Sequence, residues 1–361
     1  TLWVVPHLGC LSYYDREDKE LKPYYTDYSK PESKFTPVIL NFYVDNQKNF
    51  WYANNFWMDK ISFFPNASQL TTFDSGHETR AIMVDKQQNL WVANKKGVIR
   101  IFNPDKTLKG YLTPEGIISP KAISFSRNIY CFTEDEQGNI WMGSKWDGII
   151  RLSPKRDGSF QIRNYVHKEE DPYSLSNNSV YCIYQDSKKR MWIATHGGGI
   201  NLLQETANGK IRFLHNGNLL KGYSKDKFNK VRVIKEVNNA LLVGTTEGLI
   251  TFSCNFERPE DIKFYDNVRI PDLASSLSSN DVIYIYTDSH KNSYVLTFTG
   301  GINQIISDNL LTDHIQFKTY TKRNGLVSDL VLSMIEDQQR NLWVISENTL
   351  AKFDPENGTF E

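Results

Sequence analysis

Carboxylate side chains recur along the chain at positions where they could bind a metal or transfer a proton. Seven acidic residues are each followed, six positions later, by a large side chain. The acids are Asp45, Asp85, Asp135, Asp186, Glu236, Asp288 and Asp337, and the large residues are Trp51, Trp91, Trp141, Trp192, Leu242, Tyr294 and Trp343. A catalytic residue is unique in a chain, whereas a residue that supports a repeated scaffold recurs with it. The sequence therefore predicts structural roles for all seven pairs, and no catalytic residue, metal or cofactor.

The spacing between copies indicates the elements that hold these pairs. Successive acids lie 40 to 52 residues apart, and a partial eighth copy begins at Trp3. Such periods are typical of β-propeller blades with four strands. The segment before each acid is apolar on both faces, as in Val180–Tyr184, which indicates a strand buried on both sides. We therefore expect an all-β propeller of seven blades, each with four antiparallel strands, with eight blades as the alternative count.

Each copy has the local features of a blade. The Asp side chain is expected to accept hydrogen bonds from the amides that follow it, which closes the turn after the innermost strand. The aromatic residue then begins the second strand and packs between neighbouring blades. A single propeller domain over residues 1–361 is expected, as a piece of a longer protein. The blade motifs lie at about 1–25 (partial), 37–65, 79–112, 128–166, 179–215, 230–266, 281–320 and 329–361.

Composition limits the classes of partner. The 42 basic and 42 acidic side chains cancel, so no overall field favours nucleic acid or a membrane surface. Four cysteines without Cys-x-x-Cys spacing argue against a zinc or redox motif. Cys131 and Cys182 fall at the same strand position in two copies, so they are either small core residues or a disulfide pair. Within this sequence we expect no membrane-spanning apolar run and no signal peptide.

The repeat resembles the two-component regulator propeller repeat. The segments Glu134–Ser144 and Gln185–Thr195 match its turn and second strand, and the linkers Leu175–Val180, Leu277–Val282 and Leu326–Val331 are similar to the segments that join its blades. The resemblance covers nearly the whole chain. The copies differ from the pattern in keeping the turn glycine only as Gly138 and in replacing Trp with Leu242 and Tyr294. The sialidase Asp-box is a poorer match, because its acid precedes Trp by five residues.

This resemblance implies the periplasmic sensor region of a hybrid two-component system histidine kinase of Bacteroides-type bacteria. In that family, two seven-bladed propellers and a β-sandwich precede a membrane helix, a histidine kinase and a DNA-binding regulator. The implied partners are an oligosaccharide ligand, the second propeller and the β-sandwich of the same chain, and a second copy in a homodimer. The implied location is the periplasm, as part of an inner-membrane protein. The domain itself would be non-catalytic and would regulate polysaccharide-utilisation genes.

Ligand-binding residues are expected on the face opposite the Asp turns. The loop between the second and third strands shares that face with the linkers between blades, and this loop varies from copy to copy. The candidates are Trp57, Lys95, Lys96, Lys145, Trp146 and His196. Aromatic rings stack on sugars, and lysine attracts sulfate or carboxylate groups, so an acidic oligosaccharide would suit this set. The alternatives for these loops are a solvated surface or a contact with the partner propeller.

Two other classes of function stay open at this stage. A glycan-active enzyme, a sialidase or a lyase, would need one convergent cluster of arginines or an acid–base pair with a tyrosine. The arginines that such a cluster would draw on are scattered along the sequence: Arg80, Arg100, Arg127, Arg151, Arg163 and Arg232. The second alternative is a scaffold propeller that binds only proteins.

Overall fold

The computed structural model describes residues 2–4, 12–16, 18–23, 41–44, 50–53, 58–61, 78–224, 226–346 and 349–361. Asp45 and Trp57 lie outside these residues. The chain divides into two compact units, Thr1–Thr72 and Phe73–Glu361. The first unit contains two three-stranded antiparallel sheets, β1–β2–β3 (Leu2–Val4, Ser12–Asp15, Glu20–Pro23) and β4–β5–β6 (Asn41–Val44, Phe50–Ala53, Met58–Ile61).

The second unit consists of six antiparallel sheets, numbered here in chain order. The first is β7 (Thr79–Val84), β8 (Leu90–Asn94), β9 (Ile99–Phe102), β10 (Leu108–Leu112) and β11 (Ile118–Ser119); the second is β12 (Ile129–Glu134), β13 (Ile140–Ser144), β14 (Ile149–Pro154) and β15 (Phe160–Tyr165); the third is β16 (Val180–Gln185), β17 (Met191–Thr195), β18 (Gly199–Glu205) and β19 (Ile211–Leu214). The fourth is β20 (Val231–Val237), β21 (Ala240–Thr245), β22 (Gly248–Ser253) and β23 (Tyr265–Asn267); the fifth is β24 (Val282–Thr287), β25 (Ser293–Thr297), β26 (Gly301–Ile305) and β27 (Phe317–Tyr320); the sixth is β28 (Val331–Glu336), β29 (Leu342–Ser346), β30 (Leu350–Asp354) and β31 (Thr359–Phe360). Two short 3-10 helices, Pro259–Asp261 and Lys322–Asn324, lie in connecting segments.

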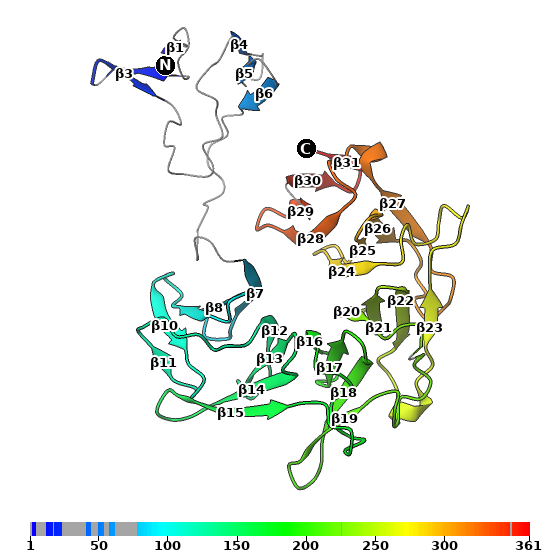
Figure 1. Ribbon diagram of the computed structural model, residues 1–361. Coiled ribbons are helices and arrows are strands. Elements are labelled where there is room, and N and C mark those ends of the chain that lie inside the picture. The colour runs from blue at the N-terminus through cyan, green and yellow to red at the C-terminus, as the bar shows by residue number, and fades with distance from the viewer. Residues whose placement is uncertain are drawn as a thin grey trace. The chain divides into compact units, whose positions relative to one another are not determined.

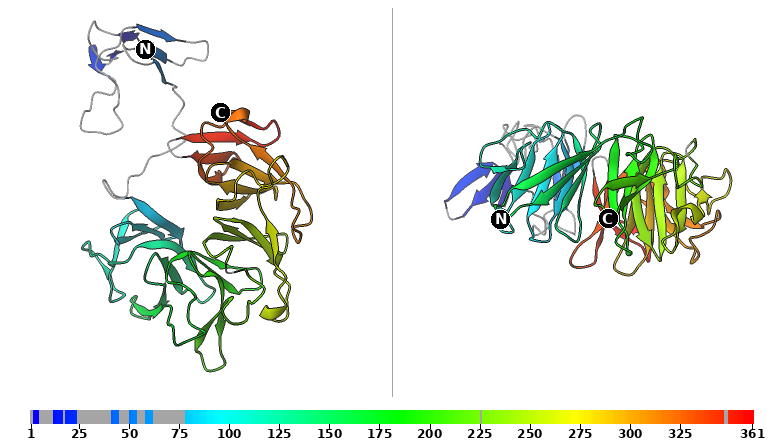
Figure 2. Two further views of the ribbon diagram at one scale, coloured as in Figure 1. Left: turned by 45° about the vertical axis from the view of Figure 1, so that its right-hand side comes forward. Right: turned by 90° about the horizontal axis from the view of Figure 1, so that it is seen from below.

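The first strand of each sheet lies on the inside of this unit. β7, β12, β16, β20, β24 and β28 contact one another in that order, and each sheet extends outward from them in chain order. Figure 1 shows these six strands along the concave side of an arc of sheets. In the right-hand view of Figure 2, the strands of the second unit run between two opposite faces, where the connecting loops lie. The fold is an all-β propeller, as the sequence predicts, and the doubly apolar segments are its inner strands.

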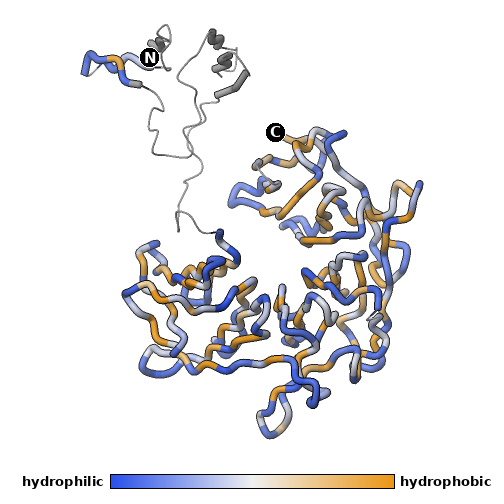
Figure 3. Tube along the Cα trace, viewed as in Figure 1, coloured by the Kyte–Doolittle hydropathy of each residue, from blue (hydrophilic) through white to orange (hydrophobic). Residues whose placement is uncertain are grey.

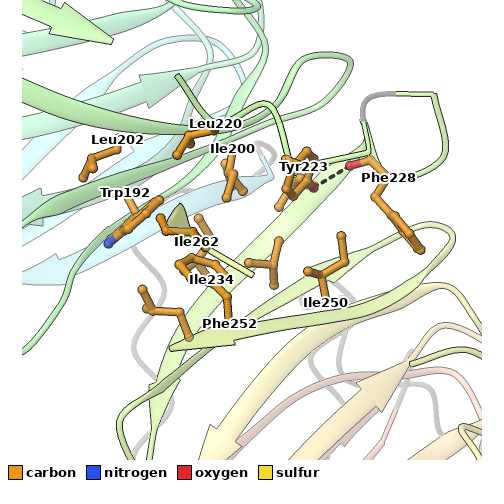
Figure 4. Close-up of a cluster of buried hydrophobic side chains, with 14 of the residues drawn as sticks. Trp192, Ile200, Leu202, Leu220, Tyr223, Phe228, Ile234, Ile250, Phe252 and Ile262 are labelled. Atoms are coloured by element: carbon orange, nitrogen blue, oxygen red, sulfur yellow. Dashed lines mark hydrogen bonds between the residues drawn. The ribbon is translucent and has the colours of Figure 1, made fainter. Parts of the chain in front are cut away.

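Apolar side chains fill the spaces between consecutive sheets. Figure 3 shows hydrophobic residues concentrated in the strands and hydrophilic residues in the outer loops. Between the third and fourth sheets, Trp192 meets Phe252 edge to face, with ring centroids 5.0 Å apart, among Ile200, Ile234 and Ile250 (Figure 4). The repeated aromatic residue therefore packs between neighbouring blades, as expected from its size.

The two outermost sheet faces of the second unit are not covered in this way. Ile82 and Val84 on the first sheet are 61% and 56% exposed, and Ile335 and Leu350 on the sixth are each 57% exposed. Exposed apolar side chains on a sheet face are unusual for a strand that is part of a core.

The acid and the aromatic residue of each repeat form one hydrogen-bonded unit. The indole N–H donates to the turn carboxylate at 2.7–2.9 Å in four pairs: Trp91 to Asp85, Trp141 to Asp135, Trp192 to Asp186 and Trp343 to Asp337. The phenol of Tyr294 lies 3.3 Å from Asp288. The same carboxylates accept amide N–H groups of the turn, such as that of Asn139 at 2.8 Å from Asp135. The spacing of six therefore reflects a structural hydrogen bond.

The fifth repeat, which forms the fourth sheet of the second unit, departs from this pattern. The prediction that Glu236 is its turn acid was wrong. Val231 pairs with Thr245 as Val180 pairs with Thr195, so the position of Asp186 is occupied by Val237. The turn there is one residue shorter, and Asn238 and Asn239 adopt positive φ angles of 47° and 62°. Leu242 carries no N–H donor, so this repeat needs no carboxylate at the turn.

Glu236 has a different role, because it links two sheets. Its carboxylate accepts the backbone N–H of Ser187 at 2.6 Å and the Ser187 hydroxyl at 2.7 Å. Glu336 accepts the corresponding groups of Ser289 at 2.8 and 2.7 Å. In both sheets this acid lies one position before the turn position, which is Val237 or Asp337, and it joins its sheet to the one before it. This explains why a carboxylate is found at Glu236 without a tryptophan partner.

Candidate ligand-binding site

One face of the second unit carries both the variable loops and the linkers between sheets. In five sheets, the residue after the second strand donates its backbone N–H, at 2.8–3.2 Å, to the carbonyl of the residue just before the inner strand. These pairs are Lys95 with Glu78, Lys145 with Asn128, His196 with Ser179, Thr246 with Lys230, and Phe298 with Asp281. The placement expected from the sequence is thus found. We call this surface the loop face.

The candidate residues that the structure describes all lie on the loop face, but they do not form one cluster. Lys95 and Lys96 are exposed, and the Lys95 ammonium lies 3.4 Å from Glu78. Trp146 is 67% exposed, and the Lys145 ammonium lies over its ring at 5.0 Å. His196 is instead half-buried and contacts the inner strand of its own sheet.

A repeated irregularity places six side chains at equivalent positions next to the loop face. Every inner strand shows a register shift after its first paired residue, which is the mark of a β-bulge. The bulge residues are Arg80, Tyr130, Tyr181, Arg232, Ile283 and Leu332, and we call them the inner row. Bulges reorient a side chain and are frequent beside binding sites. All six sheets have the same bulge, yet its residue is arginine or tyrosine in four sheets and aliphatic in two. The fold therefore does not require arginine or tyrosine at this position.

The first three members of the inner row contact one another across sheets. The Arg80 guanidinium lies over the Tyr130 ring at 5.4 Å, and the Tyr130 and Tyr181 rings are 4.8 Å apart. His196 stacks on Tyr181 with ring centroids 5.0 Å apart and an interplanar angle of 23°. These half-buried rings form a continuous aromatic surface from the second sheet to the third.

The fourth member, Arg232, continues the row through an ion pair. Its Nη2 atom lies 3.1 Å and 3.2 Å from the two carboxylate oxygens of Asp281, in the linker to the fifth sheet. Burial lowers the pKa of His196, and the positive charges of Arg232 and Lys230 lower it further, so this imidazole is neutral at pH 7. Burial raises the pKa of Asp281 above its usual value, although Arg232 opposes that shift.

The arrangement suits recognition more than bond breaking. Aromatic rings with guanidinium groups at both ends can hold a ring-shaped ligand that carries anionic substituents. Among the residues that the structure describes, no group of His, Cys, Asp and Glu side chains could hold a metal ion. Cys131 and Cys182 are free thiols whose pKa values are raised by burial, that of Cys182 to about 11, which makes them core residues rather than nucleophiles.

The ligand-binding candidates from the sequence did not include Arg80, Tyr130, Tyr181, Arg232 and Asp281, and the two arginines were named only among those scattered along the chain. Arg80 and Arg232 are far apart in the chain, and Tyr130 and Tyr181 resemble core residues of a strand. A signal was present, however. Counted back from the turn position, all four bulge residues fall at one place in the repeat, where the residue type changes from sheet to sheet while the neighbours, Thr79 excepted, stay apolar.

Comparison with known proteins agrees with this architecture. Residues 124–146 and 174–197 match the family model described as two component regulator propeller. Each match runs from a linker through the inner strand and second strand of the second or third sheet, and together they include Tyr130, Tyr181 and His196. No helix in the described part of the chain is long and apolar enough to span a bilayer.

Individual relatives are distant. The chain is 26% identical over 284 residues to histidine kinase P4 of Formosa agariphila, a match that covers 76% of this chain and 18% of that protein. It is 19% identical to the extracellular domain assigned to a hybrid two-component system of B. thetaiotaomicron, over 99% of this chain and 49% of that one, with a TM-score of 0.40. Virginiamycin B lyase from Staphylococcus aureus shares the fold, with 17% identity, a TM-score of 0.53, and coverage of 79% and 83%.

The likeness to the lyase supports the propeller fold alone, and the chain spans less than a fifth of its curated relative. The part of the chain that the structure describes is therefore an all-β propeller, and two of its segments, residues 124–146 and 174–197, are similar to the two-component regulator propeller repeat.

Proposed function

We propose that this chain is a non-catalytic, extracytoplasmic sensor domain of a hybrid two-component signalling protein, and that it binds an oligosaccharide at the loop face. The observation that carries the proposal is the inner row. Arginine and tyrosine side chains converge there at a bulge position where the fold itself tolerates aliphatic residues, and His196 stacks on one of the tyrosines. The repeat family supports the signalling context.

The rest of the proposal concerns the protein to which this domain belongs. We expect the full chain to contain a second propeller, a β-sandwich, a membrane helix and a histidine kinase, to lie in the inner membrane with this region in the periplasm, and to signal as a homodimer. The expected output is control of polysaccharide-utilisation genes. Support comes from the similarity to a histidine kinase, of which this chain covers a small part.

The test is a calorimetric titration of the chain with a panel of oligosaccharides prepared from plant, algal and host polysaccharides. For any saccharide that binds, Tyr181→Ala should weaken binding about tenfold, since an aromatic contact contributes on the order of 1 kcal/mol. Tyr111→Ala is the matched control. Tyr111 also lies beside an arginine, with Arg100 at 5.6 Å, but on the outer part of the first sheet.

Each outcome separates the classes of function. Binding that depends on Tyr181 and leaves the saccharide intact supports the sensor. Release of shorter or unsaturated products would identify an enzyme instead. If no saccharide in the panel binds, carbohydrate recognition by this domain is wrong, and a scaffold that binds proteins becomes the better explanation.

A further inference from the structure

Two arginines of the inner row have donors that nothing in the protein uses. The Nε atoms of Arg80 and Arg232 are buried and have no hydrogen-bond partner among the described residues. An unpaired buried N–H costs free energy, and such a group in a native protein calls for a water molecule, an ion or a ligand. These two donors sit at the two ends of the Tyr130–Tyr181 pair.

The charges around the row favour an anion. Lys95, Arg80, Lys230 and Arg232 provide four positive charges, and Glu78, Glu247 and Asp281 provide three negative charges. The ion pairs present engage only part of each guanidinium. Arg80 meets Glu78 through Nη2 at 3.1 Å, and Arg232 meets Asp281 through Nη2 as well. On the edge that Nε shares with Nη2, each carboxylate therefore engages Nη2 and leaves the Nε–H without a partner, and a guanidinium binds oxyanions best through two parallel N–H groups.

We propose that Arg80 and Arg232 bind oxyanionic substituents, carboxylate or sulfate, of an acidic saccharide whose rings lie against Tyr130 and Tyr181. This inference rests on the proposed sensor function and specifies the ligand class and the residues that select it. Asp281 acts as an internal competitor, because its carboxylate occupies the Arg232 guanidinium until the ligand arrives.

The first experiment observes the two Nε–H groups directly in the unmodified chain. Sodium sulfate and sodium D-glucuronate are titrated at constant ionic strength while the arginine Nε–H signals are followed by nuclear magnetic resonance. We expect saturable chemical-shift changes in the Nε–H signals of Arg80 and Arg232. The anion that binds more tightly indicates whether the site prefers sulfate or carboxylate. Arg151 and Arg212 are matched controls, because they also have a buried Nε without a partner and lie over aromatic rings, at 5.1 Å from Trp141 and 4.9 Å from Tyr173.

The second experiment uses variants, with circular dichroism as the check on folding. Arg232→Gln should weaken sulfate or glucuronate binding about tenfold or more, because a charged hydrogen bond is lost. Asp281→Asn should strengthen binding by about two- to tenfold, because a competing negative charge is removed. A purely structural ion pair predicts the opposite for Asp281→Asn, namely weaker binding or a loss of fold in parallel with Arg232→Gln.

The results distinguish this inference from the broader proposal. Shifts at all four arginines alike, or none at Arg80 and Arg232, overturn the anion site. If only neutral oligosaccharides bind and these two signals do not move, the sensor stands and the acidic ligand is wrong. If the anions move both signals but no oligosaccharide binds, the anion site stands and carbohydrate sensing is wrong.

Discussion

The carboxylate of Asp135 is expected to hold its turn and the neighbouring tryptophan in place. Asp135 is 5% exposed and accepts the Asn139 backbone N–H at 2.8 Å and the Trp141 indole N–H at 2.7 Å. Asp135→Ala leaves three buried donors without an acceptor, because the Asn139 Nδ2 also donates to this carboxylate at 2.8 Å, and each such donor costs about 1–3 kcal/mol. We therefore expect the free energy of unfolding to fall by at least about 3 kcal/mol.

Urea unfolding followed by circular dichroism measures this change. Trp141→Phe removes the indole donor, so in a double-mutant cycle with Asp135→Ala the two changes should couple by about 1–2 kcal/mol. Glu136→Ala is the control, because its carboxylate pairs with Lys189 at 2.7 Å while both side chains are at least half exposed. Such a pair contributes less than about 1 kcal/mol. A coupling energy near zero, or equal losses for Asp135→Ala and Glu136→Ala, would refute the structural role of the pair.

Three further substitutions test how the turns and the packing between sheets stabilise the fold. Hydrogen bonds, above all from the Trp343 indole, lower the pKa of Asp337 to about 2, so its stabilising contribution is complete above the unfolded value near 3.8 and is lost as the pH falls toward 2. Asp337→Asn should remove that part of the acid dependence of the urea midpoint. Gly148→Ala should lower the thermal unfolding midpoint more than Gly158→Ala. Both glycines have positive φ, but of the two only Gly148 would place a Cβ 2.2 Å from a backbone oxygen, that of Tyr165. A smaller decrease for Gly148→Ala would contradict the close approach of the Tyr165 carbonyl to Gly148. Leu242→Trp should destabilise the fold by about 1–3 kcal/mol, because the larger ring is overpacked and its N–H meets no carboxylate; an unchanged urea midpoint would contradict this.

The propeller could be read from the sequence because its determinants are local. Each Asp and Trp pair meets within six residues, so the hydrogen bond that closes the turn leaves a constant spacing in the chain. The blade period and the doubly apolar inner strands are also properties of short segments. The same reasoning failed at Glu236, since a spacing of six cannot distinguish a turn acid from a neighbouring acid that bonds to Ser187 of the previous sheet.

Only part of the candidate site could be predicted from local sequence features. The sequence located the loop face, because the order of strands in a blade decides which loops share a face. Lys95, Lys145 and His196 lie on the loop face as expected. The sequence could not tell that, among the described candidates, it is His196 that stacks on an inner-strand tyrosine. Whether the six candidates bind a ligand stays a prediction, and Trp57 lies outside the described residues.

By itself, the sequence determined the repeat, its strands and the architectural purpose of the acid–aromatic pairs, since each depends on residues close together in the chain. The tertiary structure decided which of the repeated positions carries specificity. Arg80, Tyr130, Tyr181 and Arg232 lie about 50 residues apart in sequence, and they become neighbours because consecutive inner strands pack side by side with a bulge at the same place. That juxtaposition depends on the packing of whole sheets, so the common place of these residues in the repeat acquires its meaning only when consecutive inner strands are known to pack side by side.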